Sequence, residues 1–259
     1  MRKRLFPLLA LALFAPALAL PAKPPTVQKW SFDGPFGTYD RASLQRGFLV
    51  YREVCSACHG LKHLSFRDLA APGGPGFTVR QAAAIAADFN LPASPNAEGE
   101  TVDENGMPLL RPALLSDRIP SPFDNEEKAR AANNGALPPD LSLIVKARRG
   151  GPDYVYSILV GFAEKPPAGE KPRAGMFYNP YFEGHAIAMT PPLADDTVTF
   201  PDGTKATLSQ EARDVTNFLA WASDPKLEER HRLGFEVMAF LILFAGLMGL
   251  SWRKVWKGK

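Results

Sequence analysis

The longest apolar runs in the chain lie at its two ends. Close to the N-terminus, cations at positions 2 to 4 precede an apolar run from Leu5 to Leu18 and a small-x-small cleavage site at residues 17–19, which is the pattern of a secretory signal peptide. Close to the C-terminus, the stretch from Leu233 to Trp252 contains a single charge, Glu236. As a helix it would be about 30 Å long, the thickness of a bilayer core. We therefore expect a signal peptide over residues 1–19 and a transmembrane anchor over residues 233–252.

The residues that follow the expected anchor are basic, with four Lys or Arg side chains between positions 253 and 259. Positive charge beside a span marks its cytoplasmic side. We therefore expect residues 253–259 to form a cytoplasmic tail and residues 20–230 to form a domain on the opposite side of the membrane.

Between the two ends, apolar residues recur at helical spacing. A first helix should follow Asp40 as its N-cap, with Leu44, Phe48 and Tyr51 on its buried face. A second should begin at Gly151-Pro152-Asp153, because proline suits the first helical turn. Its expected core side chains are Tyr154, Val155, Ile158, Leu159 and Phe162.

Two further helices are indicated by their first turns. One should begin at Thr207, with Gln210 as its capping-box partner, and end before Pro225. A shorter one, with an acidic first turn, is expected around Ser121 to Ala132. Alternating strand patterns are sparse and the chain has 25 prolines. We therefore expect a mainly α fold with long ordered loops, notably at 70–76, 92–108 and 164–192.

The motif with the clearest chemistry is Cys55-Ser-Ala-Cys58-His59, which contains the only two cysteines of the chain. Cys-x-x-Cys-His is the mark of covalent c-type haem attachment, because each thiol can add to one vinyl group while the histidine binds the iron. A thioredoxin-like site would need a βαβ context, and a zinc site would need further ligands. We expect one covalently attached haem c, held outside the cytoplasm of a bacterium, where free thiols tend to oxidise.

The second axial ligand decides between electron transfer and ligand chemistry, and a methionine there raises the reduction potential. Outside the two end segments the methionines are Met107, Met176 and Met189. Met189 is favoured because it lies before the last helix of the domain, in Ala188-Met189-Thr-Pro-Pro. Met176, His185 and Met107 remain as alternatives.

Charge is distributed unevenly along the chain. Residues 20–230 carry 22 basic and 26 acidic side chains, whereas the whole chain has a net charge of +3. The acids between Asp88 and Glu127 form either a solvated loop or a docking region for a basic redox partner. The candidate docking residues are Glu98, Glu100, Asp103, Glu104, Asp124, Glu126 and Glu127. No feature indicates nucleic-acid binding.

Three blocks of the sequence resemble cytochrome c1, the haem subunit of the ubiquinol–cytochrome c oxidoreductase (cytochrome bc1) complex. The first runs from Trp30-Ser-Phe-Asp-Gly-Pro-Phe-Gly-Thr-Tyr-Asp40 to His59. The second runs from Arg111-Pro112 through Ala131-Ala-Asn-Asn-Gly-Ala-Leu-Pro-Pro-Asp-Leu141, and the third from Tyr178-Asn-Pro-Tyr-Phe182 to Met189. The resemblance implies a cytochrome c-like haem domain with long ordered loops and one C-terminal transmembrane helix.

The resemblance also implies roles for single residues. Cys55 and Cys58 would form the thioether bonds, with His59 and Met189 as the proximal and distal iron ligands. Asn133 and Pro139 would line the haem, with Pro139 near the proximal imidazole, and Arg148 and Tyr154 would lie near a propionate. Glu183 departs from the proline of many members, and the disulfide of some bacterial relatives is excluded because no further cysteines exist.

The function implied is electron transfer, from a Rieske iron–sulfur protein to a c-type cytochrome, with the anchor docked on cytochrome b. The chain alone would turn over no organic substrate. The expected location is the bacterial inner membrane, with a single span and the haem domain in the periplasm. The alternatives are a haem subunit of another respiratory complex, a tethered electron carrier, or a haem enzyme or sensor with an open iron site.

Overall fold

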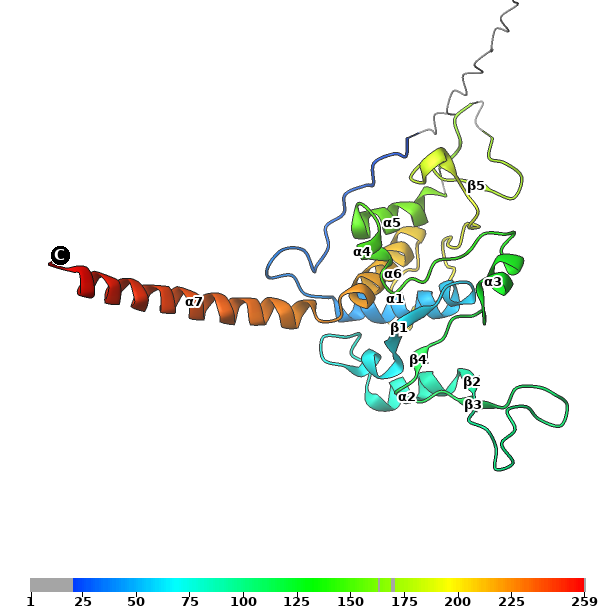
Figure 1. Ribbon diagram of the computed structural model, residues 1–259. Helices are drawn as coiled ribbons and strands as arrows, with labels where there is room; N and C mark the ends of the chain where they lie inside the picture. The colour runs from blue at the N-terminus through cyan, green and yellow to red at the C-terminus, as the bar shows by residue number, and fades with distance from the viewer. Residues whose placement is uncertain (1–20, 163, 169–170, 259) are drawn as a thin grey trace, which may run out of the picture.

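The core of the molecule is a pair of packed helices, α1 (Arg41–Glu53) and α6 (Leu208–Ser223), seen at the centre of Figure 1. The computed structural model describes residues 21–162, 164–168 and 171–258, so the expected signal peptide over residues 1–19 lies outside the described residues. Helix α5 (Gly151–Gly161) packs on α6, and the short α4 (Ile144–Ala147) packs against both.

Helix α1 begins where its sequence predicts. The Asp40 side chain accepts hydrogen bonds from the amides of Ala42 and Ser43, which satisfies donors that the first helical turn leaves unpaired. The predicted face, Leu44, Phe48 and Tyr51, is buried. On the same face a Cβ at Gly47 would lie 2.0 Å from the Asp214 carbonyl oxygen, so only glycine allows α1 to approach α6 this closely.

Helix α6 also has its predicted ends, but one half of the expected capping box is absent. The Thr207 hydroxyl accepts from the Gln210 amide at 3.2 Å. The Gln210 side-chain amide donates instead to Asp214 Oδ2 at 2.9 Å, and the Thr207 amide, which a complete box would pair with Gln210, donates to the Lys205 carbonyl at 3.0 Å. The helix ends at Ser223, ahead of Pro225.

The predicted core face of α5 is only partly correct. Val155, Ile158 and Leu159 are buried, whereas Tyr154 and Phe162 are half-buried. Phe162 falls short of the core because it lines a cavity of about 310 Å³ with Pro191, Leu193, Ala194, Asp195 and Leu208.

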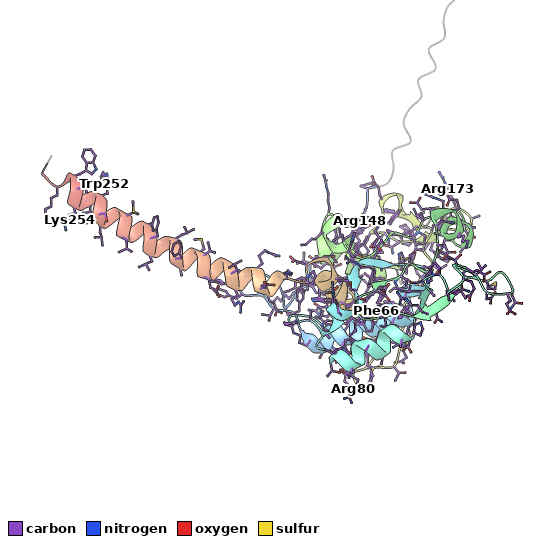
Figure 2. The ribbon with its side chains drawn as sticks, turned by 60° about the horizontal axis from the view of Figure 1, so that its bottom comes forward. Phe66, Arg80, Arg148, Arg173, Trp252 and Lys254 are labelled. Atoms are coloured by element: carbon purple, nitrogen blue, oxygen red, sulfur yellow. The ribbon has the colours of Figure 1, made fainter. Side chains whose placement is uncertain are left out.

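Two further helices differ from expectation. Helix α3 (Glu126–Ala132) begins later than Ser121, because Asn125 is its N-cap and accepts from the Lys128 amide at 2.8 Å. Helix α2 (Val79–Ala87) was not predicted from the sequence. It begins with a complete capping box between Thr78 and Gln81 and packs against the 3-10 turn η2 (Phe66–Ala70). Phe66 lies inside the body of the domain in Figure 2 and is fully buried.

Within the residues that the structure describes, the strands are short and form three antiparallel pairs. They are β1 (Leu61–Ser65) with β4 (Arg118–Ile119), β2 (Asn90–Pro92) with β3 (Leu110–Pro112), and β5 (Phe177–Tyr178) with β6 (Ala186–Ile187). The loop joining β2 to β3 projects from the body (Figure 1). The predominance of helices confirms the expected mainly α class.

The last helix, α7 (Leu227–Trp256), leaves the domain as a single long rod (Figure 1). It contains the predicted anchor, Leu233 to Trp252, but begins six residues earlier. Its large apolar side chains are exposed. Trp252 and Lys254 mark the end far from the domain in Figure 2. By length and composition α7 is long and apolar enough to cross a membrane.

Candidate haem site

The cysteine motif follows directly from the C-terminal end of α1. Cys55 opens the 3-10 turn η1 (Cys55–Ala57), and its carbonyl oxygen accepts from the amides of Cys58 at 3.1 Å and His59 at 2.9 Å. Both sulfurs and the imidazole therefore project from one tight turn. The two thiols are free, so both sulfurs are available for bonding to carbon.

The two thiols differ in their surroundings. Cys55 packs against the core and Cys58 is exposed. Burial, together with the neighbouring Cys58 sulfur, raises the pKa of the Cys55 thiol to about 12. Cys55 is therefore a protonated thiol at neutral pH, packed against apolar side chains of the core.

His59 is held in one ring orientation and one tautomer. Its Nδ1 lies 2.7 Å from the carbonyl oxygen of Pro139. A carbonyl oxygen only accepts, so Nδ1 carries the proton and Nε2 keeps its lone pair. Burial lowers the pKa of His59, and the bond to Pro139 opposes that shift in part. The result is a neutral imidazole with Nε2 ready to bind a metal.

The loop that carries Pro139 is fastened to the segment after His59. Asp140 accepts from the Lys62 amide at 3.0 Å and from the Ser142 amide at 3.0 Å, and the Leu141 amide donates to the Gly60 carbonyl at 2.9 Å. These bonds fix the Pro139 carbonyl relative to the imidazole.

Two residues in this support were not predicted as site residues. Asp140 directly follows two prolines, a position typical of an Asx side chain that binds local amides, and that pattern could have identified it. Tyr51 was assigned only to the buried face of α1. Its hydroxyl donates to the His59 carbonyl at 3.0 Å, which no periodicity argument shows.

The candidates for the second axial position have different surroundings. Met107 is 62% exposed in the projecting loop. His185 has its Nε2 3.0 Å from the Pro21 carbonyl and so already has a hydrogen-bond partner. Met176 and Met189 are both half-buried, a degree of burial that a loop lying over a bound ring would have.

Met176 and Met189 lie at the same end of the β5–β6 ladder. Phe177 pairs with Ile187, so Met176 comes one residue before β5 and Met189 two residues after β6. The ladder therefore places both methionines at one end and does not choose between them.

The remaining predicted lining residues lie in three elements. Asn133 ends α3, with its Nδ2 donating to the Ala129 carbonyl at 2.7 Å. Burial raises the pKa of Tyr154, and the nearby Arg148 guanidinium opposes this shift, so these two side chains are neighbours. Arg148 lies at the surface of the domain, as Figure 2 shows, where its charge can meet an anion.

The residues fit a covalently bound haem. The residues that the structure brings together are two thiols on one turn and an imidazole whose Nε2 keeps its lone pair. The candidates for a thioether ligand are the half-buried Met176 and Met189. Leu137 and Leu143, on the two sides of the Pro139 loop, are 36% and 47% exposed and would suit an apolar macrocycle. In the part of the chain that the structure describes, no three His, Cys, Asp or Glu side chains form a metal cluster.

A family model and several known proteins are similar to this chain, and all of them are named for cytochrome c1, cytochrome b/c1 or the b-c1 complex. The model of the Cytochrome C1 family matches residues 30–259. A Bradyrhizobium diazoefficiens protein named cytochrome b/c1 is 50% identical over 252 residues, which are 90% of this chain and 36% of that protein. Cytochrome c1 of Rhodospirillum rubrum is 45% identical, covering 88% of this chain and 87% of the relative.

A third relative comes from Candida albicans and is named cytochrome b-c1 complex catalytic subunit, mitochondrial. It is 47% identical over 234 residues, which are 90% of this chain and 77% of the relative. The chain thus spans most of the Rhodospirillum and Candida relatives and about a third of the Bradyrhizobium protein.

Proposed function

The chain belongs to the cytochrome C1 family, and on that premise we propose that it is the membrane-anchored haem subunit of a ubiquinol–cytochrome c oxidoreductase. The observation that carries the proposal is the fixed imidazole of His59 beside two free thiols, in a chain whose family match covers residues 30–259. The printed name of the Candida relative, a b-c1 complex subunit, supports assembly into such a complex.

The proposal assigns one haem c to the chain. Cys55 and Cys58 would each add an S–H group across one vinyl group of the porphyrin, a step that needs no oxidant. His59 Nε2 and the Met189 sulfur would bind its iron. Bound haem supplies a one-electron iron couple.

The surrounding residues set the orientation and charge of the site. Pro139 orients His59 through its carbonyl oxygen and lines the ring together with Asn133. Arg148 would pair with a propionate, since a half-buried carboxylate needs a charged partner. Tyr154 lies beside Arg148. These groups bind and orient; none has to move a proton during electron transfer.

The proposed partners are a Rieske iron–sulfur protein as donor, a c-type cytochrome as acceptor, and cytochrome b as the partner of the anchor. The acidic residues lie on two segments, the loop between β2 and β3 and the start of α3, both on the side of the domain away from α7 (Figure 1). Lys128 and Arg130 pair with Asp124 and Glu126 on α3. The loop acids therefore supply most of the proposed docking field.

The proposed location is the bacterial inner membrane. Residues 20–230 would lie in the periplasm, and the basic residues 253–259 would lie in the cytoplasm. Such a chain has no activity of its own on an organic substrate; it acts as a redox subunit.

The test is purification of the complex from native membranes in mild detergent. Cytochrome b and an iron–sulfur protein should accompany the chain, and haem should stay with it on a denaturing gel. Replacing both Cys55 and Cys58 by Ala should remove that denaturation-resistant haem. A chain that purifies alone, or haem lost on denaturation of the wild type, would contradict the proposal.

A further inference from the structure

Phe36 is one of the most exposed large apolar side chains of the domain, at 79%. Its ring nevertheless stacks on Phe235 of α7, with centroids 4.8 Å apart and planes 15° apart. Phe235 is the third residue of the apolar stretch 233–252. A residue of the domain therefore reaches the level at which α7 becomes apolar.

The turn that carries Phe36 is rigid. The Gly37 amide donates to the Gly34 carbonyl at 3.2 Å, and the Thr38 amide donates to the Ser31 carbonyl at 3.0 Å. A Cβ at Gly37 would lie 2.2 Å from the carbonyl of Phe32, so the chain can close this turn only with glycine. The turn holds the Phe36 ring outward instead of letting it fold into the core.

The segment after the turn is fastened to α7 at a second level. Glu228 accepts from the Tyr39 amide at 2.8 Å and pairs with the Arg41 guanidinium at 2.5 Å. Glu228 and Phe235 are seven residues apart, or about 10 Å along a helix. The segment from Arg41 to Phe36 thus runs down the first two turns of α7 toward the apolar part of the helix.

We propose that Phe36 inserts into the outer interfacial zone of the bilayer beside α7, so that the turn at residues 31–37 is a second membrane contact of the domain. The occupant is lipid, because the ring is level with the start of the membrane-spanning stretch and aromatic side chains are stable at that depth. With α7 as the only membrane contact, the domain and α7 could tilt together in the bilayer. A second contact fixes its tilt, and with it the height of the haem site above the membrane.

The experiment uses the full chain in its purified complex, reconstituted into phospholipid vesicles, with Phe36→Cys carrying a nitroxide spin label. The matched control is Val27→Cys, because Val27 is 82% exposed but its neighbours Thr26 and Gln28 bond to α5. Faster relaxation of the label in the presence of oxygen reports lipid, and faster relaxation in the presence of a water-soluble nickel chelate reports solvent. At position 36 we expect strong relaxation by oxygen and weak relaxation by nickel, and at position 27 the reverse.

Strong relaxation by nickel at position 36 would place the label in water. Weak relaxation by both reagents would place it under another subunit. Either result would overturn the proposal. If Phe36→Cys lowers haem content, a photoreactive phenylalanine analogue at position 36 replaces it. A lipid adduct is expected, and an adduct to protein alone contradicts the proposal. The labelling rests on the proposed covalent haem, because the thioether bonds would leave Cys55 and Cys58 unable to react with the label. Uptake of label by the wild-type chain would therefore count against that haem and not against the lipid contact.

Discussion

Met189 is the residue whose replacement should change the site most. Met189→Leu removes the proposed thioether, so the reduction potential should fall by on the order of 0.1 V or more, within the roughly 0.8 V range that axial ligands control. The absorption band of methionine-ligated ferric haem should also disappear. Redox titration of the purified complex measures both changes.

The matched control is Met176→Leu, because Met176 lies at the same end of the β5–β6 ladder and is equally half-buried. It should leave the potential and the band unchanged. If the two variants exchange these results, Met176 is the ligand.

Asp140 should be the residue that most affects the stability of the proximal side. Asp140→Ala leaves the amides of Lys62 and Ser142 without their acceptor and should lower the free energy of unfolding by about 1–3 kcal/mol. Asp140→Asn keeps one carbonyl acceptor and should cost less. Thermal unfolding followed by the haem spectrum gives the comparison, and equal stability of Asp140→Ala and wild type would show that the loop holds without these bonds.

For single residues, the sequence predicts side-chain chemistry better than backbone hydrogen bonding. Cys55, Cys58 and His59 are recognisable from their spacing alone. The group that fixes the His59 tautomer is the Pro139 carbonyl, and a main-chain oxygen leaves no mark in a residue pattern. The family resemblance placed Pro139 near the imidazole but did not provide the hydrogen bond.

Among the elements, the β3–β4 region has an ion pair with a clear dependence on pH. The Arg111 guanidinium and the Leu114 amide lower the pKa of Asp117 to about 2, from an ordinary value of 3.8. A lowered carboxyl pKa stabilises the fold above the unfolded value and loses that effect as the pH falls toward the folded value. The contribution should therefore disappear between about pH 4 and pH 2.

Arg111→Gln should accordingly lower the melting temperature near neutral pH, and the difference from wild type should shrink as the pH falls to about 2. Arg80→Gln is the control, because it removes the same charge from the exposed surface of α2 (Figure 2) and should give a small difference at every pH. A wild-type advantage over Arg111→Gln that persists below pH 2 would mean that packing, not the ion pair, is responsible.

Helices with strong caps and large apolar residues were predictable, and α1 and α6 show why. Asp40 and Thr207 cap them as their sequences indicate. Helix α2 was missed because five of its nine residues are alanine, which gives little contrast between faces. The Gln210 side chain does not complete the predicted capping box, because it donates to the Asp214 carboxylate one turn later. That carboxylate is buried against α1, and a sequence pattern does not show such burial.

At the scale of the whole molecule, acid is concentrated on the loop between β2 and β3. Replacing Glu98, Glu100 and Glu104 by Gln should slow the reaction with a basic c-type cytochrome several-fold at low ionic strength, and the difference should vanish at high salt. Asp103 is left intact because its carboxylate accepts from the Asn105 and Met107 amides. Stopped-flow kinetics across salt concentrations measures the effect. Rates equal to wild type at low salt would show that the loop is a solvated loop and not a docking region.

The junction between domain and anchor argues against a tethered carrier. Only residues 224–226 separate α6 from α7. Asp224 pairs with Lys146 at 3.0 Å and with Arg230 at 2.7 Å, and Glu228 holds Arg41. A carrier that swings on a linker needs a flexible connection, so this junction favours a domain held close to its proposed anchor.

The most direct test of the central claim follows the haem of this chain in native membranes after a pulse of ubiquinol. The haem should become reduced, should be reoxidised when an oxidised c-type cytochrome is added, and should bind no carbon monoxide when reduced at neutral pH. A haem that stays oxidised in the presence of quinol, or that binds carbon monoxide readily, would contradict the account.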